Sequence, residues 1–225
     1  MEQKGKSRWY DDACGTALAL EFVGERWSLL IMRELMLGPR RFSELRSTLG
    51  GISANVLTQR LESLEAVGIL RRRKLPPPAS VQVYELTPWG YESEPIFQEM
   101  GRWATRSPLH DPMLPLSPVS AMLSLRTMLA PDRGDLAMTL AFRFPNDAFV
   151  ARLDRQGLDI QRGETAAADA VFECDPTTLV RLFYGKWPMT EAEAEGLLRF
   201  TGNRDLAQRF IDLFALPPKI APPVA

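Results

Sequence analysis

The stretch GISANVLTQRLESLEAVGIL, residues 51–70, predicts a helix with two unlike faces. Ser53 is placed to cap the N-terminus of this helix, and Gly68 is placed to end it. At about 100° per residue, three leucines fall on one side, which we expect to face a core: Leu57, Leu61 and Leu64. The other side carries polar side chains, which we expect to face outward: Asn55, Thr58, Gln59 and Glu62.

The residues on either side of this helix predict further helices and a β-hairpin. Apolar residues from Ala17 to Leu37 recur at intervals of three and four, which is typical of an amphipathic helical region, and Gly24 divides it. A short helix over residues 42–49 follows. The segments ILRRRKL (69–75) and VQVYELT (81–87) flank a proline-containing tip and predict a hairpin. Thr87 and Pro88 then begin a last helix that reaches about Arg106.

This order of helix, short helix, capped helix and hairpin is that of a winged helix-turn-helix. In such a domain the capped helix enters the DNA major groove and the hairpin lies along the flanking backbone. Asn and Gln side chains can pair with an adenine edge, and arginines can bind phosphates. Residues 40–74 carry 8 Lys and Arg against 3 Asp and Glu. We therefore expect these residues to contact DNA: Arg40, Arg41, Arg46, Ser53, Asn55, Thr58, Gln59, Arg71, Arg72 and Arg73. The alternative is a solvated basic face on an ordinary helical domain.

Residues 14 to about 106 resemble the HxlR family of bacterial winged-helix transcriptional regulators. The blocks that carry the resemblance are GERWSLLIMRELMLGPRRFSEL at 24–45, the stretch at 51–70, and YELTPWG at 84–90. The resemblance implies a homodimer, built largely from the terminal helices, on a double-stranded DNA operator. Some members of the family sense oxidants or electrophiles through an early cysteine, so Cys14 is a candidate redox sensor.

A second interpretation of Cys14 is a small, half-buried residue at the start of the first helix. Asp11 and Asp12 are its near neighbours in the sequence, and we expect their charges to raise the pKa of its thiol.

The composition changes at SPLHDPMLPLSP, residues 107–118, where four prolines disfavour helix. We expect a winged helix-turn-helix domain over residues 1–106, a linker over 107–118 and a second domain over 119–225. The second domain is predicted to be α+β, with a helix at 119–130 and strands at 136–144, 149–153, 158–162, 170–174 and 197–201. Thr190 and Glu193 are spaced as a capping box for a short helix.

Residues 119–216 resemble the sterol carrier protein fold. The resemblance rests on DRQGLDIQRGE (154–164), DPTTLVRLFYGK (175–186) and EGLLRFTGNRDLAQRFIDLF (195–214). It implies an apolar tunnel for lipids, and the candidate lining is Phe142, Phe144, Phe172, Leu182, Phe183, Trp187, Phe210 and Phe214. Arg143 and Arg181 are candidate partners for a ligand carboxylate. The alternative is that the aromatic side chains simply fill the core.

The composition, 45% apolar and 24% charged over 225 residues, is that of a globular chain with one or two domains. Two cysteines and one histidine are too few for a disulfide framework or an ordinary zinc site, and no apolar run approaches the roughly 20 residues of a membrane span. We expect a cytoplasmic protein without metal or cofactor. No histidine lies in the second domain, and no glycine-rich phosphate loop follows a strand, so we expect no enzyme.

The sequence therefore predicts a DNA-binding transcriptional repressor whose second domain binds an apolar or lipid-like small molecule. Residues 107–225 carry 12 Lys and Arg against 15 Asp and Glu, so we expect no direct DNA contact from the second domain. Two alternatives remain. One is a constitutive DNA-binding dimer whose second domain is only structural, and the other is a lipid carrier.

Overall fold

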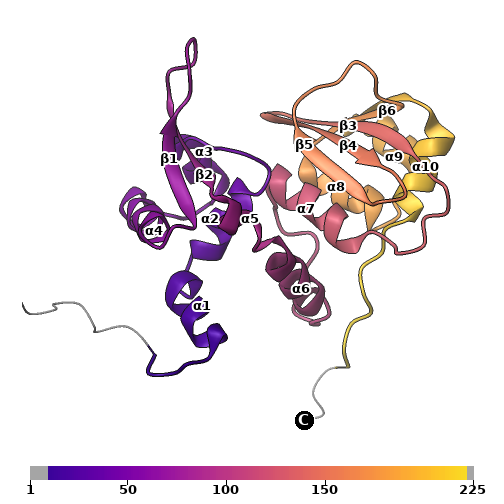
Figure 1. Cartoon of the computed structure of the whole chain (residues 1–225). Coiled ribbons are helices and arrows are strands. Elements are labelled where there is room, and N and C mark those ends of the chain that lie inside the picture. Colours follow the sequence, from indigo (N-terminus) through magenta and orange to yellow (C-terminus); the bar gives the residue numbers. More distant parts are fainter. Residues whose placement is uncertain (1–9, 222–225) are drawn as a thin grey trace, which may run out of the picture. The chain divides into compact units, whose positions relative to one another are not determined.

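The computed structural model describes residues 10–221, and the chain forms two compact units that divide after Ser93. Figure 1 shows the helices and strands of each unit. None of the helices within residues 10–221 is long and apolar enough to cross a membrane.

The first unit is a helical domain with a two-stranded wing. Leu57, Leu61 and Leu64 are all buried, and the Ser53 hydroxyl accepts a hydrogen bond from the Val56 amide at 3.2 Å, as predicted. Gly68 follows the helix with a φ of 77°, a left-handed conformation that favours glycine. The elements are α1 (Gly15–Val23), α2 (Ser28–Leu35), α3 (Phe42–Thr48), α4 (Ala54–Ala66), β1 (Leu70–Lys74), β2 (Gln82–Leu86) and α5 (Pro88–Tyr91).

The wing is an antiparallel hairpin in which Leu70 pairs with Leu86 and Lys74 with Gln82. Arg40 adds a third short segment, because its amide donates to the Tyr84 carbonyl at 2.9 Å and its carbonyl accepts from the Tyr84 amide at 2.8 Å. The segment before α3 is thereby joined to the wing. Alternation along β1 puts Arg71 and Arg73 on one face and Arg72 on the other.

The second unit is α+β, as expected. Its five-stranded sheet has the order β5-β4-β3-β6-β7, in which β3 and β6 are parallel and the other neighbours are antiparallel. The strands are β3 (Met138–Phe144), β4 (Asp147–Leu153), β5 (Leu158–Arg162), β6 (Ala170–Cys174) and β7 (Leu198–Gly202). The helices are α6 (Glu94–Thr105), α7 (Pro118–Met128), α8 (Pro176–Phe183), α9 (Met189–Ala194) and α10 (Arg204–Asp212).

Two local features differ from the sequence predictions. The helix expected from Thr87 to Arg106 is interrupted, and its longer part, α6, packs on α7 through an ion pair between Glu94 and Arg126 at 2.9 Å. The compact units therefore divide after Ser93, earlier in the chain than the proposed linker at 107–118. The capping box of Thr190 and Glu193 is wrong, because α9 begins earlier and its N-cap is Pro188.

Candidate functional site

The exposed face of α4 is polar and free of large apolar side chains. Asn55, Thr58 and Gln59 are all exposed, opposite the three buried leucines. Ser53 is exposed as well, but its hydroxyl caps the helix, so part of its hydrogen-bonding capacity is already used. Amide side chains in the first turns of a helix that enters the major groove can reach base edges.

The three wing arginines are paired with carboxylates. The Nε atoms of Arg71 and Arg73 donate to the two oxygens of Glu85, at 2.7 and 2.5 Å. Arg72, on the opposite face, pairs with Glu65 at the end of α4 at 2.6 Å. Burial raises the pKa of Glu85, but hydrogen bonds from Arg73 and Arg71 outweigh it and hold that pKa below its usual value. The arginines are therefore held in fixed positions, and a phosphate must compete with Glu65 or Glu85 for them.

We expect the two faces of β1 to differ in their contribution to DNA binding. A wing arginine that contacts a phosphate should, when changed to alanine, flatten the slope of log K against log salt by about one unit. Arg71 and Arg73 share a face, so Arg71→Ala and Arg73→Ala should behave alike and differ from Arg72→Ala. If the Arg71 face lies on DNA, only the first two variants flatten the slope, and if the Arg72 face does, only Arg72→Ala flattens it. Titration at several salt concentrations measures this. Unchanged slopes in all three variants would show that the wing does not lie on DNA.

The arginines before α4 fall into two groups. Arg41 and Arg46 are exposed, as a phosphate contact requires. Arg40 differs from the prediction, because its side chain is buried, with 7% of the residue exposed. Burial lowers the pKa of Arg40, and the charges of Glu34 and Glu44 act in the opposite direction. Arg40 therefore belongs to the interior of the first unit and is not placed as a phosphate contact requires.

Cys14 is the N-cap residue of α1, and its side chain is exposed rather than half-buried. Its thiol pKa lies below the usual value, because the backbone amides of Thr16 and Ala17 and the Thr16 side chain favour the thiolate. The expectation that Asp11 and Asp12 would raise this pKa is therefore wrong. The second cysteine, Cys174, is the opposite case, because burial raises its thiol pKa to about 12.

We expect alkylation to separate the two cysteines. A lowered pKa means a larger thiolate fraction at a given pH. The rate at which Cys14 reacts with iodoacetamide should therefore rise with pH around a midpoint below the ordinary thiol pKa of about 8.5. Cys174 should stay unmodified in the folded chain between about pH 6 and pH 9, because its pKa is about 12. Mass spectrometry of the Cys14→Ser and Cys174→Ser variants over this pH range measures both rates. A midpoint for Cys14 at or above that of a free thiol would show that the amides at the start of α1 do not stabilise its thiolate.

The residues predicted to line an apolar tunnel lie mostly in one packed aromatic cluster. Phe142 stacks on Phe172 at 5.4 Å between ring centres, and Phe183 contacts Phe214 at 5.3 Å. The ring centre of Phe210 lies 4.9 Å from that of Phe214. These five rings and Leu182 have no exposed surface. Rings from β3, β6, α8 and α10 thus fill the space between the sheet and its helices.

The remaining predicted ligand residues lie at the edge of this cluster or outside it. Phe144 is buried against Phe149 at 6.0 Å. Trp187 is half-buried and lies under the guanidinium of Arg181, 3.7 Å from the ring centre. Arg181 is therefore engaged with an aromatic ring rather than directed into the core.

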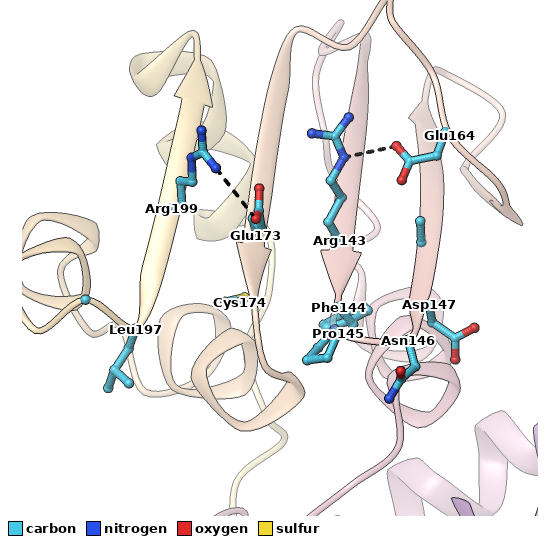
Figure 2. Close-up of a pocket in the computed structure, with 12 residues that line it drawn as sticks. Arg143, Phe144, Pro145, Asn146, Asp147, Glu164, Glu173, Cys174, Leu197 and Arg199 are labelled. Atoms are coloured by element: carbon cyan, nitrogen blue, oxygen red, sulfur yellow. Dashed lines mark hydrogen bonds and ion pairs between the residues drawn. The ribbon is translucent and has the colours of Figure 1, made fainter. Parts of the chain in front are cut away.

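An open groove of about 740 Å³ lies on the second unit, lined by residues at the ends of β3, β6 and β7 and by the turn between β3 and β4 (Figure 2). Two ion pairs lie along it, Arg143 with Glu164 at 3.0 Å and Arg199 with Glu173 at 3.9 Å. Arg143 therefore lies in a polar groove instead of beside the aromatic cluster. Because its arginines already face carboxylates, the groove does not indicate the charge of a ligand.

Among the residues that the structure describes, no group of three His, Cys, Asp or Glu side chains could hold a metal ion. A capped helix with an exposed polar face, followed by a basic two-stranded wing, defines a winged helix-turn-helix DNA-binding domain.

Comparison with known proteins agrees with this class. Residues 22–110 match the HxlR-like helix-turn-helix family model. The HTH-type transcriptional regulator YodB of Bacillus subtilis is 41% identical over 86 residues, covering 38% of this chain and 77% of YodB. The HTH-type regulator YvaP of the same organism is 37% identical over 87 residues, covering 39% of this chain and 81% of YvaP. The chain belongs to the HxlR-like helix-turn-helix family and is a transcriptional regulator.

The solved structure of reduced YodB from B. subtilis is 36% identical and covers 44% of this chain and all of that chain, with a TM-score of 0.40. Residues 129–215 match the SCP-2 sterol transfer family model. The chain therefore joins an HxlR-like DNA-binding domain to a second domain of the SCP-2 type.

Proposed function

We propose that the protein is a repressor that binds its operator as a homodimer, with α4 in the major groove of each half-site. The observation that carries this proposal is the pair of unlike faces on α4. Three leucines hold one face in the core, while Asn55, Thr58 and Gln59 are exposed on the other. The exposed Arg41 and Arg46 and the wing arginines supply charge for phosphates on both sides of this face.

The homodimer is supported by an apolar stripe on α6. Ile96, Met100 and Trp103 follow one another at intervals of four and three residues, and they are 53%, 45% and 77% exposed. Large apolar side chains in a contiguous stripe favour burial by a partner. Two copies related by a two-fold axis match an operator with two half-sites, which in this class of protein lie about one helical turn apart.

The second unit is proposed to bind an apolar small molecule that changes operator affinity. The match to the SCP-2 sterol transfer family supports this proposal. The eight residues predicted from the sequence remain the proposed ligand contacts, but five of them are fully buried aromatic rings in mutual contact. A ligand at that position must therefore separate packed rings before it can enter.

One experiment tests the central proposal. Purified full-length protein selects DNA from a random duplex library, and the selected site is titrated by fluorescence anisotropy and by native mass spectrometry. We expect a partly palindromic site that holds two chains, and lower expression of a reporter that carries the site. Failure to enrich any sequence would contradict operator recognition, and one chain per site would contradict the homodimer.

Native mass spectrometry of the protein as purified separates the effector proposal from its alternative. A co-purified lipid-like molecule, lost when operator DNA is added, supports a ligand-controlled switch. If added apolar compounds leave operator affinity unchanged, the second unit is a structural module of a constitutive DNA-binding dimer.

A further inference from the structure

A groove of about 500 Å³ lies on the second unit, outside the aromatic cluster. One wall is the C-terminal half of α6, with Arg102 and Trp103, together with Arg106 just after it. The other walls are the end of α7 with the residues after it, including Leu129, and the segment after α10, including Leu213 and Pro217. Its size is within the range of about 300–1,000 Å³ that small-molecule sites occupy.

The walls of this groove are held in place by hydrogen bonds. Arg102 donates from Nε to the Thr127 carbonyl at 3.0 Å, which ties α6 to α7. The Ala130 amide donates to the Leu213 carbonyl at 2.9 Å, which ties the end of α7 to the segment after α10. That segment is in turn fixed to the end of α6, because the Ile220 amide donates to the Arg106 carbonyl at 2.8 Å. The groove is therefore formed before any ligand arrives.

The groove combines apolar walls with one available positive charge. Arg102 is paired with Glu99, whereas the Arg106 guanidinium is exposed and has no hydrogen-bond or ion-pair partner within residues 10–221. Trp103 beside it is 77% exposed. A planar guanidinium binds a carboxylate through two parallel hydrogen bonds, and an exposed indole ring gains from covering by an apolar group.

We propose that this groove binds a small organic carboxylate with an aromatic or aliphatic body. The carboxylate pairs with Arg106, and the body lies on Trp103 against Leu129 and Leu213. The inference rests on the proposed function, because it locates the effector of the regulator and states its chemical class.

A ligand in the groove would contact α6, the helix that follows the DNA-binding domain in the chain. Trp103 and Arg106 lie in and just after α6, which begins at Glu94, three residues after α5 of the first unit ends at Tyr91. A ligand that bridges α6 and the segment after α10 strengthens the attachment of this helix to the second unit. Trp103 also belongs to the stripe proposed as the dimer surface, so ligand binding and dimerisation are expected to be coupled.

The test uses two probes of similar shape, 2-naphthoate and the neutral 2-naphthalenemethanol, in isothermal titration of the full-length protein. We expect naphthoate to bind at least tenfold more tightly than the alcohol. Arg106→Gln should remove this difference, and Leu213→Asp should abolish binding of naphthoate. The control is Arg209→Gln, which removes an exposed arginine on α10 and should change neither affinity. Circular dichroism confirms that each variant is folded.

Three results would overturn the proposal. The first is equal binding of the two probes by the unmodified protein, or no binding at all. The second is naphthoate binding that survives both Arg106→Gln and Leu213→Asp, which would place the ligand in the aromatic cluster. The third is an absence of binding together with a shift of Leu213→Asp from dimer to monomer in sedimentation, which would show that a second copy occupies the groove.

Operator titrations on the same variants separate this proposal from the one on which it rests. If naphthoate binds as described but operator affinity does not change, the groove stands and the effector role fails. If Arg106→Gln loses naphthoate but still binds operator, the DNA-binding role stands independently of the groove.

Discussion

Replacing Phe183 with alanine is expected to destabilise the second unit by about 3–5 kcal/mol. Phe183 lies at the centre of the aromatic cluster, with ring centres at 6.2 Å from Phe142, 5.8 Å from Phe172 and Phe210, and 5.3 Å from Phe214. It has no exposed surface. Its removal leaves a cavity lined by four rings from several different elements, which cannot all move inward together.

Hydrogen exchange measured by mass spectrometry assigns this loss to one unit. Peptides from β3 and β6 should exchange at least a hundredfold faster in Phe183→Ala, while peptides from α4 keep their protection. Phe200→Ala is the matched control. Because Phe200 is only half-buried on β7, this substitution should lower the free energy of unfolding by less than Phe183→Ala does. If Phe183→Ala lowers the free energy of unfolding by less than about 1 kcal/mol, the ring borders open space, as the tunnel interpretation requires.

The local structure of both units could be predicted because it depends on nearby residues. The spacing of Leu57, Leu61 and Leu64 predicts α4 and its buried face, and Ser53 and Gly68 predict where the helix begins and ends. The alternation of apolar residues likewise predicts the strands of the sheet. These signals act over one or two helical turns or a few strand residues, and the structure confirms them.

The partners of charged and amphipathic segments could not be predicted in the same way. Periodicity shows that α6 has an apolar side, but not that the helix packs on α7 through Glu94 and Arg126. The basic run 71–74 indicates phosphate binding, but not that Arg72 pairs with Glu65, 7 residues away, or Arg71 with Glu85, 14 residues away. The register of the hairpin could have identified Glu85 as a partner of Arg71, because the two residues lie directly opposite each other.

Two features of the candidate sites depend on quantities that a sequence does not contain. The pKa of Cys14 is lowered by backbone amides that point at its thiol only once α1 has formed, so counting neighbouring aspartates predicts the wrong direction. The aromatic residues of the second unit have the same spacing whether they line a tunnel or fill a core. The difference is a matter of volume, and the structure adds only that the ring centres lie 4.9–5.4 Å apart, so these rings pack on one another.

The second large effect is expected on DNA recognition. Alanine in place of Asn55 or Gln59 should weaken binding to the selected operator by about 1–3 kcal/mol, or about 5- to 150-fold, because each amide can make two hydrogen bonds to one base edge. Both side chains are exposed on a face whose opposite side is fully buried, so neither substitution should disturb folding. Binding to random duplex DNA should change far less, since phosphate contacts supply most of that affinity.

The matched control is Gln208→Ala, which removes an exposed amide from α10 and should affect neither kind of DNA. Thr58 lies on the same exposed face, and Thr58→Ala should give a smaller loss because a hydroxyl lacks the paired donor and acceptor with which an amide binds one base edge. The decisive comparison is the ratio of specific to random affinity at one fixed salt concentration. Equal losses on both DNAs for Asn55→Ala and Gln59→Ala would show that these side chains only help to position the helix. Base recognition would then have to come from residues other than these two amides.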